Sequence, residues 1–250
     1  LHTLLWQQRP RWAEAQIVAV ILGGLALDKA LGWSGQLLAD AWALGIFGWL
    51  WLHGGSLERR VMLACLVISG LGEGFEALPA EVKAELGAGG ARAAAGVMRV
   101  DEGTRGVVAG LGEGFLSLIW GLYDYQFHNI PVFVPPGHAL LMTLGLMVLR
   151  RVPAWFVWAV PTLAAPWALA GIWLGWDTAG ALLFLLLAIC MAVSRARALY
   201  AVMFVLALLM ELYGTWLGNW PWNPQVPWLG LTTTNPPLHA GAFYCALDLL

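Results

Sequence analysis

Long unbroken apolar runs, each of about 18 to 22 residues, recur along the whole chain. A run of this length crosses a hydrocarbon layer of about 30 Å as a helix. Only 11% of the residues are charged and 60% are hydrophobic, whereas an average soluble domain has roughly 25% charged residues. Membrane strands would alternate over about ten residues, while helices satisfy their own backbone in lipid. The sequence therefore predicts an all-α, polytopic integral membrane protein.

Breaks rich in charge, Pro or Gly divide the chain into eight or nine expected helices of one membrane domain, residues 1–250. The expected spans are 16–33, 38–54, 60–78, 105–122, 136–151, 153–175, 178–194, 197–217 and 237–250. The segment 79–105 carries many charged residues among Ala and Gly, so we expect an exposed polar loop. The chain starts without a signal-peptide pattern and stops inside an apolar segment, so we expect trimming at both ends.

Charge predicts the orientation. The formal net charge of −2 offers no basic surface for nucleic acid. One expected side collects Lys29, Lys83, Arg92, Arg99, Arg105, Arg150, Arg151, Arg195 and Arg197, and the other has Arg9, Arg11, Arg59 and Arg60. The positive-inside rule makes the first side cytoplasmic, in a bacterial or archaeal inner or plasma membrane. The aromatic loops 123–135 and 218–236 then face outward, where an interfacial anchoring belt is the simplest interpretation of their Trp and Tyr residues.

Two segments about one hundred residues apart share an order of features. In each, a Glu within an expected helix precedes an aromatic-rich loop, and Pro-Pro-x-His-Ala then opens the next expected helix. The shared residues are Glu113, Trp120, Tyr123, Tyr125, Pro135, Pro136 and His138 in the first segment and Glu211, Trp216, Trp220, Trp222, Pro236, Pro237 and His239 in the second. We interpret residues 105–151 and 197–250 as a parallel repeat, because an even number of expected crossings separates the two Glu-bearing helices.

The two Glu and two His residues of this repeat are the candidate catalytic groups. Proline suits the first turn of a helix, so each Pro-Pro places His138 or His239 in a first turn at the outer end. An ionisable residue inside a membrane costs several kcal/mol unless it is paired or solvated, which makes Glu113 and Glu211 functional candidates. The four side chains could converge on one site. The structural alternative is a protonated Glu bonded to a helix carbonyl or an Arg, and a His that only caps a helix.

Two further features favour packing over chemistry. The cysteines Cys65, Cys190 and Cys245 are scattered within apolar segments and predict neither a disulfide nor a cysteine metal site. The string Gly-Leu-Gly-Glu-Gly-Phe occurs at 70–75 and at 110–115. Small residues at such spacings permit close packing of helices.

Three classes of function fit these residues. The first is an enzyme in which a buried carboxylic acid protonates an alkene of a lipid-soluble substrate and aromatic faces stabilise the carbocation. The second is an iron, zinc or manganese enzyme, although the helical Glu-x-x-His pairs of di-iron bundles are missing. Its ligands would be Glu113, His138, Glu211 and His239. The third is a non-enzymatic subunit or transporter that binds pigment or conducts protons or ions. We predict the first class, with no cofactor and with membrane lipid, substrate and further subunits as candidate partners.

A resemblance supports this choice. The stretch from Glu113 to Ala139, with Gly-Leu-Tyr-Asp-Tyr at 121–125 and Ile-Pro-Val-Phe-Val-Pro-Pro at 130–136, resembles the membrane-bound carotenoid biosynthesis proteins that include the bacterioruberin-type 1,2-hydratases. Gly218 through Trp222 and on to Asn235 is similar to a later part of that family. The likeness covers about 60 residues in two pieces. The doubled Pro-Pro-x-His-Ala differs from the family pattern.

The resemblance implies addition of water to the terminal double bond of a C40 or C50 polyene, without a redox cofactor. It implies that Glu113 donates a proton or orients water, that Tyr123 and Tyr125 line the pocket, and that Asn235 is a polar partner. Our interpretation of the repeat adds Glu211, His138 and His239 to the acid–base set. The expected substrate-binding residues are Trp120, Tyr123, Tyr125, Trp216, Trp220, Trp222 and Asn235.

Overall fold

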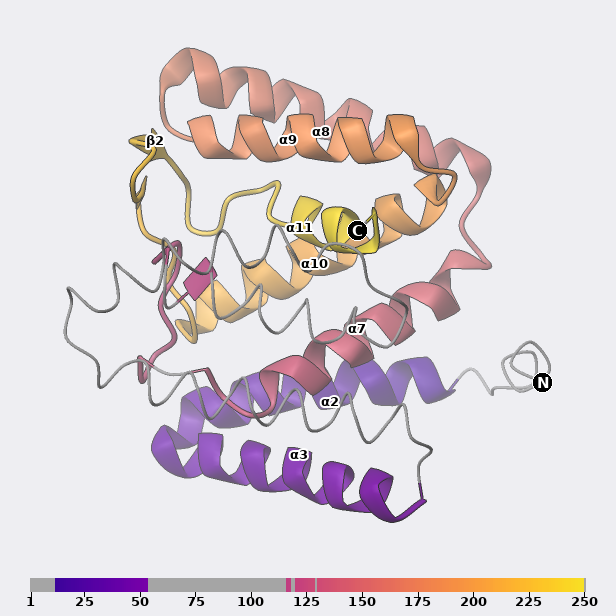
Figure 1. Ribbon diagram of the computed structural model, residues 1–250, viewed down its shortest axis with the longest axis vertical. Helices are drawn as coiled ribbons and strands as arrows, with labels where there is room; N and C mark the ends of the chain where they lie inside the picture. Colours follow the sequence, from indigo (N-terminus) through magenta and orange to yellow (C-terminus); the bar gives the residue numbers. More distant parts are fainter. Residues whose placement is uncertain (1–11, 54–115, 118–119, 129, 250) are drawn as a thin grey trace.

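The computed structural model describes residues 12–53, 116–117, 120–128 and 130–249. This part of the chain is mostly helical, with one antiparallel hairpin (Figure 1). Its helices are α2 (Trp12–Leu31), α3 (Trp33–His53), α7 (Val134–Leu149), α8 (Ala154–Leu174), α9 (Thr178–Val193), α10 (Arg197–Leu217) and α11 (Ala242–Leu249). The hairpin pairs β1 (Gln225–Val226) with β2 (Leu231–Thr232). The prediction of a helical protein is confirmed.

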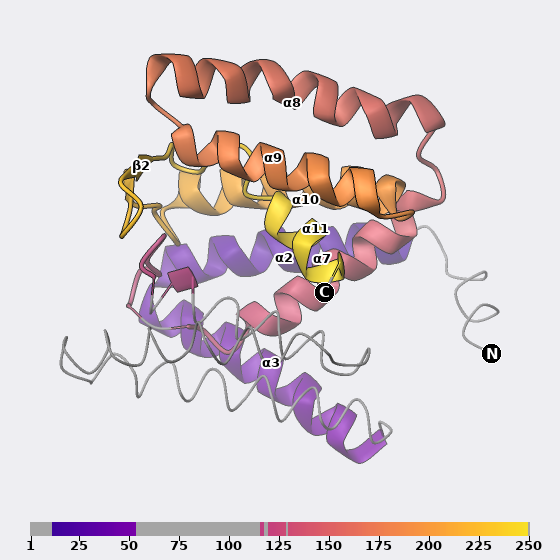
Figure 2. The same cartoon turned by 45° about the horizontal axis from the view of Figure 1, so that its top comes forward.

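Helix α10 is the central element. It packs against α7, α8, α9, α11 and α2, with α8 and α9 on one side of it and α2 and α3 on the other (Figure 1). Turned by 45°, the molecule shows α8 as the outermost helix on its side, with α9 beneath it (Figure 2). The buried face of α10 combines small and aromatic residues, among them Tyr200, Ala201, Phe204 and Ala207. The small residues let the neighbouring helices approach closely.

Helices α2 and α3 pack as a close pair, for which two glycines are responsible. Gly32 has a φ of +55°, in the left-handed region that glycine adopts without strain, and turns the chain between the two helices. Gly35, in the first turn of α3, lies directly against the backbone of Leu27 and Asp28, and a Cβ atom there would overlap it. The close packing of α2 and α3 therefore requires glycine, which has no side chain, at position 35.

The two ends of the helices differ in chemistry. One end, the arginine end, holds the connections from α7 to α8 and from α9 to α10, with Arg150, Arg151 and Arg195. Helix α2 begins at this end, since Arg151 Nη1 lies 2.6 Å from Glu14 Oε2. The opposite end, the aromatic end, holds residues 120–128, 130–133, 175–177 and 218–233.

Lys29 lies at the aromatic end. Its Nζ donates a hydrogen bond to the carbonyl oxygen of Gly218 at 3.1 Å. The assignment of Lys29 to the same side as Arg150, Arg151 and Arg195 is therefore wrong. The physical reason is that α2 starts at the arginine end, so its last turn reaches the other end.

Two loops that are distant in sequence pair at the aromatic end. Tyr123 and Trp222 form an antiparallel bridge. Backbone hydrogen bonds flank it, from Asp124 N to Pro221 O at 3.1 Å, from Asn223 N to Leu122 O at 2.9 Å and from Gln126 N to Asn219 O at 2.9 Å. The loops therefore lie at the same end of the helices and form one layer across it.

Six expected spans correspond to helices of similar bounds, namely α2, α3, α7, α8, α9 and α10. Of the described helices, α8 and α10 are long and apolar enough to cross a membrane. The expected span 60–78, the polar loop 79–105 and most of the span 105–122 lie outside the described residues. The eight or nine spans and the repeat therefore stay predictions.

The expected helix over 237–250 is wrong in its first part. Residues 235–241 form turns, with hydrogen bonds from Ala240 N to Pro237 O and from Ala242 N to His239 O, and α11 follows with eight residues. The end of the span 105–122 is also different, because residues 120–122 are not helical. Apolar composition alone does not distinguish a buried turn from a helix.

Candidate functional site

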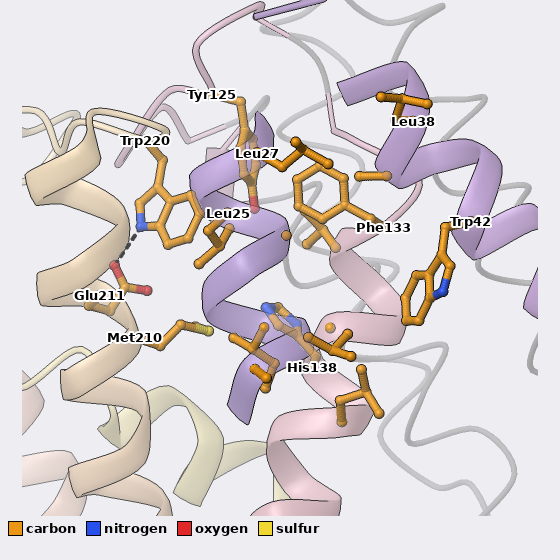
Figure 3. Close-up of a pocket in the computed structure, with 18 of the residues that line it drawn as sticks. Leu25, Leu27, Leu38, Trp42, Tyr125, Phe133, His138, Met210, Glu211 and Trp220 are labelled. Atoms are coloured by element: carbon orange, nitrogen blue, oxygen red, sulfur yellow. Dashed lines mark hydrogen bonds between the residues drawn. The ribbon is translucent and has the colours of Figure 1, made fainter. Parts of the chain in front are cut away.

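An apolar cavity of about 330 Å³ lies between α2, α3, α7 and α10, beneath the paired loops of the aromatic end (Figure 3). This is the lower part of the range of about 300–1,000 Å³ that is usual for small-molecule pockets. The labelled residues of the lining are Leu25, Leu27, Leu38, Trp42, Tyr125, Phe133, His138, Met210, Glu211 and Trp220. Among the described residues of this lining, Glu211 and His138 are the ionisable side chains apart from the phenols of Tyr123 and Tyr125.

Glu211 is held by two tryptophans. Its Oε2 accepts hydrogen bonds from Trp220 Nε1 and from Trp222 Nε1, both at 2.9 Å. Both indole side chains are buried, with 7% of each residue exposed. Two N–H donors on one oxygen stabilise the negatively charged carboxylate. In Figure 3, Glu211 extends from α10 with Trp220 above it.

The local sequence explains this arrangement. Helix α10 ends at Leu217, and Gly218, with a φ of +80°, reverses the chain in the left-handed conformation common at helix ends. The ring of Trp220 then lies directly on Gly214, where a Cβ atom would overlap it. Residues two apart in an extended segment point to the same side. Trp220 and Trp222 therefore both reach Glu211, which lies almost two turns before the end of α10.

His138 enters the cavity from α7. The helix begins at Val134 with a proline in its first turn, so the expectation that Pro-Pro starts a helix just before His138 is confirmed. The imidazole makes an edge contact with Tyr244 of α11, with ring centroids 5.5 Å apart. Figure 3 shows Glu211 and His138 reaching the cavity from different helices.

Aromatic rings form the outer wall. The centroid of Tyr123 lies 5.8 Å from that of Tyr125 and 4.8 Å from that of Trp222, and Tyr125 lies 6.0 Å from Trp220. Tyr123, Tyr125 and Trp220 line the cavity together with the two ionisable residues. Five of the residues proposed from sequence, Glu211, His138, Tyr123, Tyr125 and Trp220, are thus brought together.

His239 lies apart from this cavity. It is 1% exposed, its Nε2 lies 3.2 Å from the carbonyl oxygen of Ala164 in α8, and the rings of Phe184 and Phe204 lie 5.5 and 5.9 Å away. It occupies a turn before α11 and not the first turn of a helix. The expected convergence of both histidines on one site is therefore wrong, because the two Pro-Pro segments adopt different structures.

The remaining proposed residues take other positions. Trp216 is 77% exposed on the outer face of α10. Asn235 Oδ1 accepts a hydrogen bond from Trp222 N at 2.9 Å and so holds the segment that carries the indole. Trp120 and Trp222 line a second apolar cavity of about 280 Å³ beside α9. Glu113 lies outside the described residues.

The sequence did not identify the residues of α2 and α3 that line the cavity, such as Leu25 and Trp42. In a helix that is apolar on all sides, the pattern of residues does not indicate which face lies against a ligand. Sequence reasoning also missed Asp28, a buried acid beneath the paired loops. The signal was available, because an ionisable residue inside an apolar run is a functional candidate.

Within the described ranges, no group of three or more His, Cys, Asp or Glu residues is placed to hold a metal ion. The predicted four-ligand set includes Glu113, which these ranges do not contain, and His239, which lies elsewhere.

Comparison of the chain with protein-family models, with curated proteins and with solved structures gives no match in any of the three.

Proposed function

We propose that this chain is an integral membrane enzyme whose aromatic-end cavity binds a lipid-soluble, isoprenoid-like substrate and adds water to one of its double bonds. The proposal joins the apolar cavity to the acid–base residues in its lining.

The outer faces of the helices support the membrane part of the proposal. Large apolar side chains are strongly exposed on α8 and α10, with Trp173 at 86%, Leu163 at 78% and Trp216 at 77%. In water, many large exposed apolar side chains favour aggregation or assembly. In lipid they form the ordinary outer surface of a helix bundle.

Exposed lining residues on α3 support a substrate that extends out of the cavity. Two of its lining residues, Leu38 and Trp42 of α3, are also exposed by 54% and 46%, so the cavity reaches the outer surface beside α3. A volume of about 330 Å³ is enough for one end group of a long isoprenoid. The rest of the substrate would extend through this opening into the acyl chains.

Glu211 would act as the base. Hydrogen bonds from Trp220 and Trp222 favour its carboxylate form. A fixed carboxylate inside an apolar cavity can accept a proton from attacking water and stabilise a neighbouring carbocation. This double hydrogen bond is the observation that carries the proposal.

His138 would act as the acid. Its proton adds to one alkene carbon, the second carbon becomes a carbocation, and the faces of Tyr123 and Tyr125 stabilise that charge. Water then attacks the cation and loses one proton to Glu211. His138 has then lost one proton, Glu211 has gained one, and the substrate has gained one H₂O. Transfer of a proton from Glu211 to His138 returns both groups to their starting states.

The decisive experiment measures hydration in membranes that contain the protein. An acyclic C40 polyene with terminal double bonds is added in H₂¹⁸O, and the extract is analysed by mass spectrometry. We expect a product that has gained H₂¹⁸O. Glu211→Gln should lower the rate at least about 100-fold, the usual contribution of a general base.

Glu14→Gln is the matched control. It makes the same chemical change at the arginine end, outside the cavity lining, and should leave turnover within about twofold. Full turnover in Glu211→Gln would exclude the role of that residue. Glu113→Gln in the same assay tests the role implied by the resemblance.

A pigment- or isoprenoid-binding subunit is the second candidate, favoured by the aromatic wall of the cavity. It predicts that the wild-type protein retains the polyene through purification and forms no ¹⁸O product. A proton- or ion-conducting subunit would instead show neither binding nor turnover of the polyene.

A further inference from the structure

We infer that the aromatic end contains a binding site for a small hard cation, formed by oxygen atoms of Asp28, Asn219 and Gln36. The site lies beside the cavity and is separate from the proposed chemistry of Glu211 and His138.

Asp28 is the centre of this site. The residue is 2% exposed. Its Oδ2 accepts hydrogen bonds from Gln126 Nε2 at 2.8 Å and from Asn219 Nδ2 at 3.1 Å. Its Oδ1 is buried and has no hydrogen-bond partner among the residues that the structure describes. Half of a buried carboxylate is therefore left for another ligand.

Asn219 supplies a second oxygen. Its Nδ2 donates to Leu25 O at 3.0 Å as well as to Asp28. The two acceptors fix the orientation of the amide, because a flipped amide would turn its oxygen toward them. Its Oδ1, in a residue that is 2% exposed, then has no partner within the described ranges.

Gln36 supplies the third oxygen. It is 2% exposed and follows Gly35, which lies against the backbone of Asp28. Its Oε1 is buried and likewise without a partner in the described part of the chain. Three buried oxygen acceptors without donors thus come from α2, from the first turn of α3 and from the loop after α10.

A hard cation would satisfy all three oxygen atoms. Sodium and calcium bind carboxylate and amide oxygens directly, so a site for them needs acceptor atoms and no hydrogen-bond donor. A water molecule can donate to two of the three oxygens and needs a donor in return. Within the described residues, the charged neighbours of Asp28 are Asp40, one turn after Gln36, which adds negative potential, and Lys29, whose amine donates to Gly218 O.

The proposed cation site connects the wall of the cavity with the loops that cover it. Asp28 follows Leu25 and Leu27, which line the cavity, and Gln126 and Asn219 belong to the paired loops that cover it. A cation bound to these oxygens would join α2, α3 and both loops at one point. Cation binding would therefore stabilise the outer wall of the cavity.

The test is thermal unfolding of the purified protein in detergent, followed by tryptophan fluorescence. The protein is stripped with EDTA and dialysed into choline chloride, and NaCl or CaCl₂ is then added at constant ionic strength. We expect a saturable rise of several degrees in Tm with at least one of the two salts. No rise with either salt would overturn the inference and assign the three oxygens to bound water.

Variants locate the effect. Asp28→Asn should abolish the rise, whereas Asp124→Asn, which changes an exposed carboxylate at the same end, should keep it. Gln36→Met removes one oxygen without breaking any side-chain hydrogen bond that the structure records. It should therefore fold normally and reduce the rise, which keeps the test decisive if Asp28→Asn fails to fold. An unchanged rise in Gln36→Met and in a folded Asp28→Asn would show that the ion binds elsewhere.

Discussion

The side chain of Glu211 shows what a sequence reveals at the scale of one residue. A carboxylic acid in an apolar helix stands out, and so do the tryptophans that follow it. The sequence did not indicate that both indoles donate to the same oxygen, because this depends on the reversal at Gly218 and on the contact of Trp220 with Gly214. The two hydrogen bonds that hold Oε2 of Glu211 are therefore a structural result.

The hydrogen bond that the indole N–H of Trp222 donates to Glu211 should increase the rate of hydration. Trp222→Phe keeps an aromatic ring but removes one N–H donor from Glu211. A hydrogen bond to a charged group contributes about 1.5–3 kcal/mol, so the hydration rate should fall by about tenfold or more.

Trp216→Phe is the control for this change, since Trp216 is 77% exposed and outside the cavity lining. Comparable Tm values in the two variants would assign the loss to the hydrogen bond. Equal hydration rates in the two variants would contradict the role of the indole.

At the scale of the elements, prediction succeeded where apolar length decides the outcome. Helices α8, α9 and α10 match their expected spans closely, because charged or polar residues and glycines flank each long apolar segment. Pro161 and Pro166 lie inside α8 without ending it. Prediction failed at residues 235–241. There Gly241 lies directly against the backbone of Phe204 in α10, and this contact between distant segments favours a turn that local pattern does not reveal.

The contact between α2 and α3 allows a matched pair of substitutions on one helix. Gly35→Ala places a methyl group against the backbone of Leu27 and Asp28, so the helices must separate. We expect destabilisation by about 1–3 kcal/mol and a lower Tm in detergent.

Gly45→Ala, on the same helix, meets open space. It should be neutral or stabilising by up to about 1 kcal/mol, because alanine is the better helix former. Equal Tm values for the two variants would show that α2 and α3 are not held together in this way.

For the whole molecule, the sequence predicted helices and aromatic loops correctly but misplaced Lys29. The positive-inside count assigns a side to each charged residue from the number of membrane crossings along the chain. One missing or additional crossing therefore moves every charged residue on one side of that point in the sequence to the opposite side of the membrane. Contacts such as that between Glu14 and Arg151 avoid this problem, because they show directly which segments share an end.

The arginine and aromatic ends should lie on opposite sides of a membrane. Single cysteines can report this in a chain whose native cysteines are replaced by alanine. Gln225→Cys and Arg195→Cys both fall at exposed positions, one at each end. In sealed vesicles, a membrane-impermeant maleimide should label only one of them until detergent is added. Labelling of both in intact vesicles would contradict a transmembrane arrangement.

The pairing of the two loops also has a consequence for synthesis. Gly121 and Asn223, which are joined by a hydrogen bond, are 102 residues apart in sequence. At the usual speed of translation, about 5–20 residues per second, the first loop leaves the ribosome roughly 5–20 s before its partner exists. Throughout that interval Tyr123 lacks Trp222, and the wall that they share cannot form. The cavity should therefore be among the last parts of the molecule to mature, and a chain interrupted before Trp222 would insert its early helices without acquiring a site.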